Sequence, residues 1–329
     1  MKHIVSRATV LIFVILVSFL SCKSKAQEKT ETETSKETSI SQKEEITSLF
    51  DEAALITRLK ELSSDRYEGR KTGEKGNALA RTFIINEFKK LNVLPIKDSF
   101  EQSFNFSHKN KEYPHAGINV LGKIAGTVHP DKYIVVSAHY DHLGIINDKI
   151  YNGADDNASG VAALVSFAEY FKKNPPKHTV ILAAFDAEEL GLAGAKYFVE
   201  NMPIAKDDIV LNINMDMISR NINNELYVVG ARYNDILKSV LKDFKNPTDI
   251  KLSQGHDGSD GKDDWTKASD HGPFHNIDIP FLYFGEEDHP DYHKHTDEFK
   301  GVMPVFYTKV VKLIISVFAE VDVTLSKSR

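Results

Sequence analysis

The sequence predicts an α/β protein with one folded domain, in which helices cover both faces of a mostly parallel central sheet. Short apolar runs rich in β-branched residues alternate along the chain with amphipathic helical runs, an order typical of strands joined by crossover helices. The length of 329 residues is enough for one large domain with a sizeable core. The formal net charge of −6 argues against a nucleic-acid-binding protein, because such domains are usually basic.

Six short apolar segments are expected to be strands, from their length and their content of β-branched residues. They are Ile118–Ile124, Tyr133–Ala138, Thr179–Phe185, Ile209–Asn214, Glu225–Val229 and Pro280–Phe284. Six amphipathic segments between and around them are expected to be helices. They are Asp51–Leu62, Gly76–Leu91, Ser159–Lys173, Gly194–Glu200, Tyr233–Phe244 and Met303–Val321.

The N-terminal residues are expected to be a signal peptide with a lipid anchor. A short basic start precedes an apolar run from Ala8 to Leu20, which is short for a membrane span and typical of a secretory signal in residues 1–21. The ending FLSC resembles the lipobox of bacterial lipoproteins and places the only cysteine, Cys22, at the residue that is lipidated. We therefore expect an exported protein anchored by lipid to a bacterial membrane. A plain signal peptide and a buried structural cysteine are the alternatives.

Residues 22–48 are expected to form a disordered tether between the lipid and a folded domain at residues 49–329. The tether segment KSKAQEKTETETSKETSISQKEE is rich in Lys, Glu, Ser and Thr and has almost no apolar residues. Such a composition cannot bury enough apolar surface to offset the entropy lost on ordering.

Clusters of polar residues follow three of the predicted strands at the point where each strand ends. SAHYDHLG begins at the end of one strand, DAEELGLAG follows the second and MDMISR follows the third. Sites in open α/β sheets form beyond the carboxyl ends of the strands. We therefore expect these clusters to lie close together.

The residues that converge are carboxylates and imidazoles: His139, Asp141, Asp155, Asp156, Glu188, Glu189, Asp216 and those of the late loop HPDYHKHTDE. Such a set suits zinc, and the near-absence of cysteine excludes thiolate sites. Five or more ligands suggest two zinc ions, which can polarise a carbonyl together. Taken alone, YNGADDNASG reads as a loop followed by a helix N-cap, a role that needs only one of its two aspartates.

The motifs SAHYDHLG, NGADDNASG, FDAEELGLAG, NMDM, SDHGPF and DYHKHTD resemble, in order and spacing, those of a family of two-zinc exopeptidases. This family includes aminopeptidase Y, bacterial leucyl aminopeptidases and glutamate carboxypeptidase II. The resemblance runs from about Leu59 to the C-terminus and implies the zinc-exopeptidase fold, which is phosphorylase/hydrolase-like.

The resemblance implies a role for each metal ligand. His139 and Asp216 resemble the ligands of one zinc ion, and Glu189 and His293 those of the other. Asp155 resembles the carboxylate that bridges both ions. In the family a cis peptide bond follows the bridging aspartate, so the bond between Asp155 and Asp156 is expected to be cis.

The resemblance also implies three residues that act on the reaction. Glu188 resembles the general base that takes a proton from water and passes it to the leaving amine. Asp141 resembles the acid that fixes the tautomer of the imidazole two residues before it. Tyr292 resembles the donor to the developing oxyanion.

Several of these assignments have competitors on sequence grounds. Glu188 and Glu189 could exchange roles, because the spacing of adjacent loop residues does not orient them. His293 competes with His295 and His289 as the last ligand, and Tyr292 could be only an aromatic residue of the pocket wall. His142, His271 and His275 could be ordinary loop residues, although His271 could also line the site.

The most favoured function is therefore that of an aminopeptidase that cleaves the N-terminal residue of peptides with two zinc ions. A carboxypeptidase is less favoured, because the segment between Leu91 and Ile118 is too short for the insert of the glutamate carboxypeptidase branch. The alternatives are a single-zinc acyltransferase similar to glutaminyl cyclase and a non-catalytic binding domain.

The loop QGHDGSDGKDDWTKASD is expected to lie over the pocket, where its acids could bind an accessory calcium ion or simply be solvated. Nothing in the sequence indicates the oligomeric state.

Overall fold

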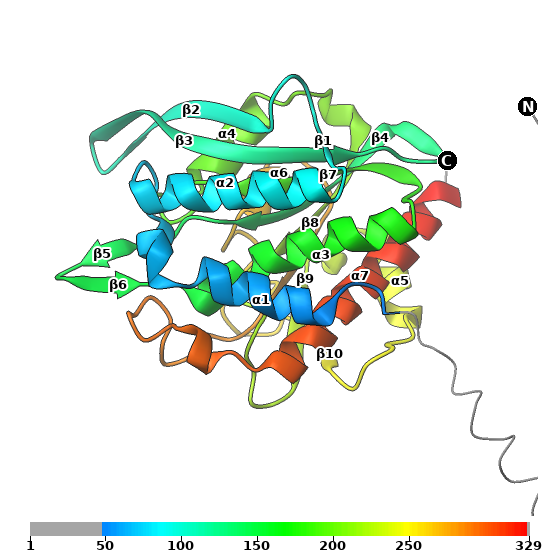
Figure 1. The fold of residues 1–329 in the computed structure, drawn as a ribbon. Coiled ribbons are helices and arrows are strands. Elements are labelled where there is room, and N and C mark those ends of the chain that lie inside the picture. The colour runs from blue at the N-terminus through cyan, green and yellow to red at the C-terminus, as the bar shows by residue number, and fades with distance from the viewer. Residues whose placement is uncertain (1–47, 328–329) are drawn as a thin grey trace, which may run out of the picture. The chain divides into compact units, whose positions relative to one another are not determined.

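A mixed nine-stranded sheet forms the centre of the computed structural model, which describes residues 48–327 (Figure 1). The predicted signal peptide, Cys22 and all but the last residue of the predicted tether lie outside the described residues. Four parallel strands make the middle of the sheet, in the spatial order β7 (His178–Phe185), β4 (His129–His139), β8 (Ile209–Met215) and β11 (Phe281–Gly285). Their carboxyl ends consequently lie at one edge.

The flanks of the sheet are largely antiparallel. On one side, β3 (Lys111–Ile124) pairs with β7, and both β1 (Leu94–Pro95) and β2 (Glu101–His108) pair with β3. On the other side, β9 (Glu225–Val229) is antiparallel to β11 and parallel to the outermost strand, β10 (Lys251–Gln254). A separate small hairpin consists of β5 (Gly144–Ile146) and β6 (Lys149–Tyr151).

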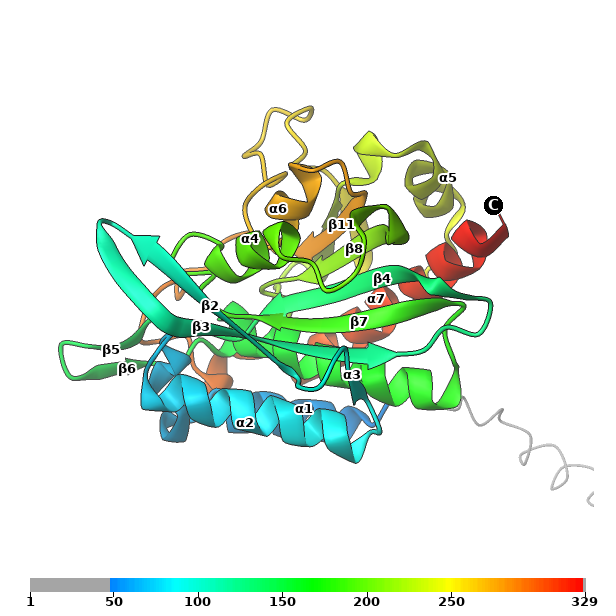
Figure 2. The same cartoon turned by 90° about the horizontal axis from the view of Figure 1, so that it is seen from above.

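Helices cover both faces of the sheet, as the view in Figure 2 shows. One face is covered by α1 (Glu52–Leu62), α2 (Lys75–Lys90), α3 (Gly160–Lys173) and α7 (Pro304–Lys327), and the other by α4 (Ala193–Glu200) and α6 (His271–His275). The helix α5 (Asp235–Asp243) packs against α7. The predicted fold class is thereby confirmed. Within residues 48–327, no helix is both long enough and apolar enough to cross a lipid bilayer.

The middle strands are buried on both faces, which explains their continuous apolar sequences. In β4, Ile134 and Val136 belong to the core beneath α1, α3 and α7, whereas Val135 belongs to the core beneath α4 and α6. Side chains of β7 alternate between the two cores in the same way. This alternation fixes which residues at the strand ends face the site.

All six predicted strands and all six predicted helices are present, with shifts at their ends. The largest difference is β3, which begins at Lys111, seven residues before the predicted start at Ile118. There it pairs with β2 in a long hairpin whose turn residues, Lys109 and Asn110, both have positive φ. Two-residue hairpin turns of this conformation match the twist of the strands.

Candidate metal centre and active site

The site lies where the sequence predicts it, beyond the carboxyl ends of β4, β7, β8 and β11. A pocket of about 400 Å³ opens there. Its wall includes His139, Asp156, Glu188, Glu189, Asp216 and His293. Of the predicted metal ligands, only Asp155 is absent from this wall.

Asp156 takes the position that the sequence analysis assigns to Asp155. The carboxylate of Asp156 has one oxygen 3.3 Å from His139 Nε2 and the other 3.3 Å from His293 Nε2. Asp155 instead accepts hydrogen bonds from the backbone and hydroxyl of Ser219, at 2.8 and 2.7 Å, and lies 3.1 Å from His289 Nε2. The structure therefore contradicts the position expected of Asp155 and favours Asp156 as the residue common to both histidines.

The backbone explains why the two aspartates face different ways. Asp156 has φ −101° and ψ 95°, an extended conformation in which successive side chains point to opposite sides. The cis peptide bond correspondingly joins Asp156 to Asn157, one bond later than the predicted Asp155–Asp156 bond.

A first set of ligand atoms, here called the His139 group, comprises His139, Asp156 and Asp216. Nε2 of His139 lies 3.3 Å from oxygens of both carboxylates. All three side chains are almost completely buried, and their nearest ligand atoms lie within 4.8 Å of one another. Buried carboxylates this close together need a compensating positive charge.

A second set, here called the Glu189 group, comprises Glu189, His293 and the same Asp156. His293 Nε2 lies 3.2 Å from one oxygen of Glu189. The other oxygen of Glu189 lies 2.7 Å from Nδ1 of His142, a residue that the sequence analysis leaves among possible ordinary loop residues. Asp156 thus faces both groups, and one of its oxygens is turned to each.

The unpaired atoms of the site fit divalent cations. Asp216 Oδ1, Glu189 Oε1 and His142 Nδ1 are buried and have no hydrogen-bond partner among the described residues. Burial opposes ionisation of Asp156, yet His142, His139 and His293 together hold the pKa of its carboxyl well below its usual range. Ionised carboxylates and imidazole nitrogens with free lone pairs are the ligands that zinc prefers in cysteine-free sites.

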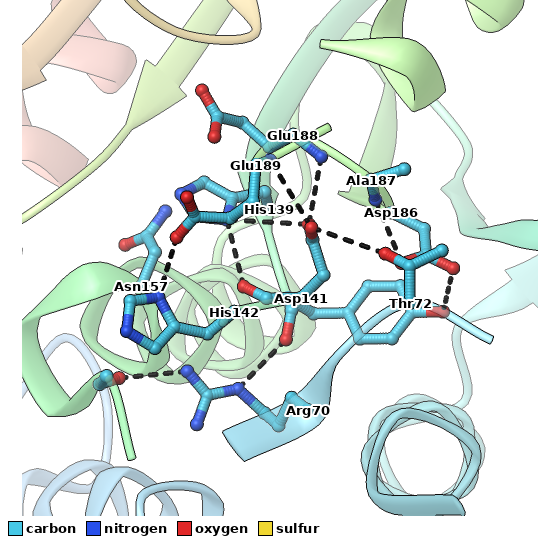
Figure 3. A network of polar contacts seen from close by, with 12 residues as sticks. Arg70, Thr72, His139, Asp141, His142, Asn157, Asp186, Ala187, Glu188 and Glu189 are labelled. Carbon is cyan, nitrogen blue, oxygen red and sulfur yellow. Dashed lines mark hydrogen bonds and ion pairs between the residues drawn. The ribbon is translucent and has the colours of Figure 1, made fainter. Parts of the chain in front are cut away.

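Asp141 contacts both His139 and the glutamate pair (Figure 3). Its backbone carbonyl lies 3.1 Å from Nδ1 of His139, whereas its carboxylate lies 3.6 Å from that atom. The carboxylate accepts hydrogen bonds from the backbone amides of Glu188 and Glu189, at 3.0 and 3.3 Å. Asp141 therefore positions the whole Glu188–Glu189 turn as well as the imidazole.

Glu188 lines the pocket beside the two groups without belonging to either. Burial raises the pKa of its carboxyl well above the usual range, and the neighbouring carboxylates of Asp216, Asp270 and Glu189 raise it further. A raised pKa is the property expected of a carboxyl group that exchanges protons near neutral pH. Tyr292 also lines the pocket, with its ring stacked 4.0 Å from that of His293.

The histidines that compete with His293 have other partners. His289 binds Asp155, and His295 Nε2 lies 3.0 Å from Nζ of Lys149. His271 is buried against Phe281 and Tyr283, and burial lowers the pKa of its imidazole to about 3. His271 is therefore a neutral core residue and is absent from the described pocket wall.

The Asp-rich loop before α6 uses its carboxylates to hold its own backbone. Asp260 accepts hydrogen bonds from the amides of His256 and Lys262, Asp257 from Ser259, and Asp264 from Thr266. The two ligand clusters found among residues 48–327 comprise His139, Asp156 and Asp216, and His142, Asp156 and Glu189, and neither includes this loop.

Among relatives with curated descriptions, the chain is 30% identical over 191 residues to a glutamate carboxypeptidase 2 homolog of Caenorhabditis elegans, an overlap of 50% of this chain and 24% of that protein. It is 29% identical over 197 residues to aminopeptidase YwaD of Bacillus subtilis, an overlap of 56% of this chain and 40% of that protein. The chain thus spans less than half the length of these relatives.

Solved structures share the fold at low sequence identity. A zinc aminopeptidase from Bacillus subtilis superposes with a TM-score of 0.64 at 17% identity, covering 82% of this chain and 94% of that one. A glutaminyl cyclase from Bacteroides thetaiotaomicron gives a TM-score of 0.65 at 17% identity, covering 82% and 98%.

The model of peptidase family M28 matches residues 119–318, which include the His139 group, the Glu189 group and Glu188. This match covers more than half of the chain. The chain therefore belongs to peptidase family M28.

Proposed function

We propose that the protein is a zinc-dependent aminopeptidase that removes the N-terminal residue of peptides with two zinc ions. The observation that carries this proposal is the position of Asp156, one carboxylate shared by two groups of ligand atoms in one pocket. Aminopeptidase YwaD among the relatives, and a zinc aminopeptidase among the structures that share the fold, support the same reaction class.

The His139 group would hold one zinc ion and the Glu189 group the other, with Asp156 common to both. When bound, zinc ions polarise the scissile carbonyl and lower the pKa of water beside it. Within the chain, Asp141 holds the imidazole of His139 and the backbone of the glutamate pair in place.

Glu188 is the residue that we assign to proton transfer. Its carboxyl, whose pKa is raised by burial, accepts a proton from the attacking water and later gives it to the nitrogen of the leaving amine. Tyr292 stands in the same wall and would donate its hydroxyl hydrogen to the oxygen that gains negative charge.

An aminopeptidase fits the fold better than a carboxypeptidase with an inserted domain, since the segment between α2 and β3 holds only β1 and β2. A single-zinc cyclising acyltransferase would require one ligand group, whereas Asp156 faces two. The metal content of the protein separates the peptidase from the acyltransferase, and the requirement for a free amino group separates an aminopeptidase from a carboxypeptidase.

The test is to measure zinc in the purified protein together with its turnover of a panel of aminoacyl-p-nitroanilides and their N-acetylated forms. We expect two zinc ions per chain and hydrolysis that requires a free amino group. One zinc per chain with cyclisation of N-terminal glutamine would support the acyltransferase instead. Two zinc ions without hydrolysis of any free or blocked substrate would contradict the aminopeptidase function.

A further inference from the structure

We propose that His142 is a fourth protein ligand of the cation held by the Glu189 group, so that the two metal sites are unequal. This inference rests on the proposed function only in that a divalent cation occupies the site. Neither the family match nor any relative assigns a role to His142.

The first argument is the position of Nδ1 of His142. It lies 2.7 Å from Glu189 Oε1 and 3.8 Å from Asp156 Oδ2, and the side chain is completely buried (Figure 3). His142, Asp156 and Glu189 have ligand atoms within 4.8 Å of one another, as compact a cluster as the His139 group.

The second argument is that these close atoms lack hydrogen bonds. Nδ1 of His142 and Oε1 of Glu189 are buried and 2.7 Å apart, close enough for an ion pair, but their geometry is not that of a well-formed hydrogen bond. Burying two unsatisfied polar atoms is costly, and native structures rarely do so. Two ligands of one cation would show this arrangement, because their lone pairs converge on the ion.

The third argument is that the backbone makes room for this ring. Gly153 lies against it, and a Cβ at that position would come within 2.0 Å of the backbone oxygen of Asp156 and within 2.5 Å of Cδ2 of His142. Gly153 has φ +52°, a conformation that other residues rarely adopt. His142 follows His139 by three residues, so the end of β4 supplies one imidazole to each group.

The consequence is chemical. Zinc with four protein ligands is usually a closed, structural site, whereas three ligands leave a position for water or substrate. With His142, the Glu189 group would have four protein ligands and could hold water or substrate only as a fifth ligand, whereas the His139 group, with three, would be the more open site. We therefore expect the two zinc ions to bind with unequal affinity, and the ion at the open site to leave first when a chelator is added.

The test is zinc X-ray absorption on the zinc-loaded protein, which counts imidazole ligands, combined with affinity from chelator competition. The wild-type protein should show three imidazoles shared by two zinc ions, and His142→Ala should show two. The affinity of the tighter site should fall by at least about 100-fold, beyond the roughly 10- to 100-fold typical of losing an outer hydrogen bond. Free imidazole should restore part of that affinity to His142→Ala.

His295→Ala is the matched control, since this histidine lies near the same loop but contacts Lys149 instead of the ligand groups. It should change neither the imidazole count nor the affinity. If His142→Ala does not fold, His142→Gln keeps a polar side chain of similar length and should also lose one imidazole.

An equal imidazole count in the wild type and the His142 variants would overturn the proposal, even with a lower affinity, because it would leave His142 as a positioning residue for Glu189. The wild-type count alone decides the matter if no variant folds. A protein that binds two zinc ions but hydrolyses no peptide would contradict the proposed function and leave the coordination result standing.

Discussion

The side chains of Glu188 and Glu189 have different surroundings, although the two residues are adjacent and one carboxylate binds both of their backbone amides. Asp141 accepts the amide hydrogens of both Glu188 and Glu189, which fixes the turn between them. The side chain of Glu189 then meets His293, whereas that of Glu188 stays in the pocket wall. Neighbouring residues of one chemical type can in this way serve as a ligand and as a proton carrier.

Glu188→Gln should keep both zinc ions and lose most of the turnover. The side chain lies outside both ligand groups, and removal of a general base typically costs on the order of 10²- to 10⁴-fold in rate. Glu189→Gln replaces a charged ligand by a neutral amide, so zinc content should fall toward one per chain and added zinc should restore part of the activity. Zinc stoichiometry and peptidase rate measured on both variants test these expectations.

The opposite pattern, in which Glu188→Gln loses metal and Glu189→Gln keeps it, would mean that the two roles are inverted. If neither substitution lowers turnover, the two-zinc peptidase mechanism is wrong. Binding of a substrate-like inhibitor to Glu188→Gln serves as the control for an intact pocket.

The two aspartates of the preceding loop should also differ on substitution. Asp156→Asn should weaken both metal sites, because its oxygens face both ligand groups. Asp155→Asn should keep the zinc but lower the free energy of unfolding by about 1–3 kcal/mol, since Asp155 is buried and binds Ser219 and His289. Zinc analysis and thermal unfolding of both variants decide the assignment, and metal loss in Asp155→Asn alone would return the bridging role to that residue.

At the scale of elements, one arginine joins three helices. Arg58 of α1 lies 2.8 Å from Glu87 of α2 and 2.5 Å from Glu169 of α3. All three side chains are about nine-tenths buried, which removes the solvent screening that weakens surface ion pairs. These helices cover the sheet face opposite α4 and α6 (Figure 2).

Arg58→Ala should lower the free energy of unfolding by about 3 kcal/mol, because it removes the arginine partner of two buried carboxylates, of which Glu87 keeps only its pair with Lys90 and Glu169 only the backbone amide of Asp51. The loss should depend on pH. Burial alone would raise the pKa of the Glu87 carboxyl, but Lys90 and Arg58 hold this pKa below its usual value. A carboxyl whose pKa is lower in the folded state than in the unfolded state stabilises the fold at pH values above its unfolded pKa. This contribution is lost as the pH falls through the folded pKa.

Denaturant unfolding from pH 7 to pH 3 measures this dependence. The difference between the wild type and Arg58→Ala should shrink toward the acid end. Arg66→Ala removes an exposed pair with Glu61 and should change stability by less than about 1 kcal/mol at every pH. A difference for Arg58→Ala that is constant over the range would contradict the linkage to Glu87.

The sequence predicts those elements whose burial is uniform and misses those whose stability comes from pairing. The strands β4, β7 and β8 are continuous apolar runs because both of their faces are covered. In contrast, β2 is half exposed, and β5 and β6 have three residues each. Such segments form strands because they pair with a neighbouring strand, and the hydrophobic pattern of one segment does not reveal that pairing.

The candidate site shows the same division between pattern and geometry. The order of the motifs predicts which loops meet, and all of them lie at one edge of the sheet. Which of Asp155 and Asp156 faces the pocket depends on the backbone angles at that turn, and spacing does not encode these angles. The sequence analysis leaves His142 among possible ordinary loop residues for a related reason, because this residue meets Glu189 only after the chain has turned at the end of β4.

At the scale of the whole molecule, we propose that the chain is exported and anchored through lipid at Cys22, which lies outside the described residues. One acyl chain binds membranes only marginally, whereas several chains anchor a protein stably. Cys22→Ala should therefore release the protein from the membrane fraction in soluble, active form. Fractionation and mass spectrometry of the N-terminus measure this, and a Cys22→Ala variant that stays with the membranes would show that the lipobox interpretation is wrong.

The charge balance of the site should make the stability of the whole protein depend on metal and on pH. Several groups there hold protons more tightly in the folded chain than an unfolded chain would. Burial raises the pKa of Asp270 to about 8 and that of Glu188 well above its usual range, and hydrogen bonds to Asp156 and Glu189 raise that of His293 to about 10. Where the folded state binds more protons than the unfolded state, stability falls as the pH rises.

We therefore expect the zinc-free protein to lose stability steadily from pH 5 to pH 8, a range that lies between the unfolded pKa of 3.8 and the folded pKa of about 8 for Asp270, and to lose more up to about pH 10 through His293, whose unfolded pKa is 6.5. The loaded protein should change little, because zinc supplies the missing positive charge and binds better once its ligands are deprotonated. Free zinc at 1,000 times its dissociation constant contributes about 4 kcal/mol per site, which corresponds to an increase of the unfolding temperature on the order of 10 °C. Calorimetry with and without a chelator at several pH values measures the gap, which should widen with pH. Equal unfolding temperatures throughout would mean that no cation neutralises the buried carboxylates, and the candidate metal centre would have to be abandoned.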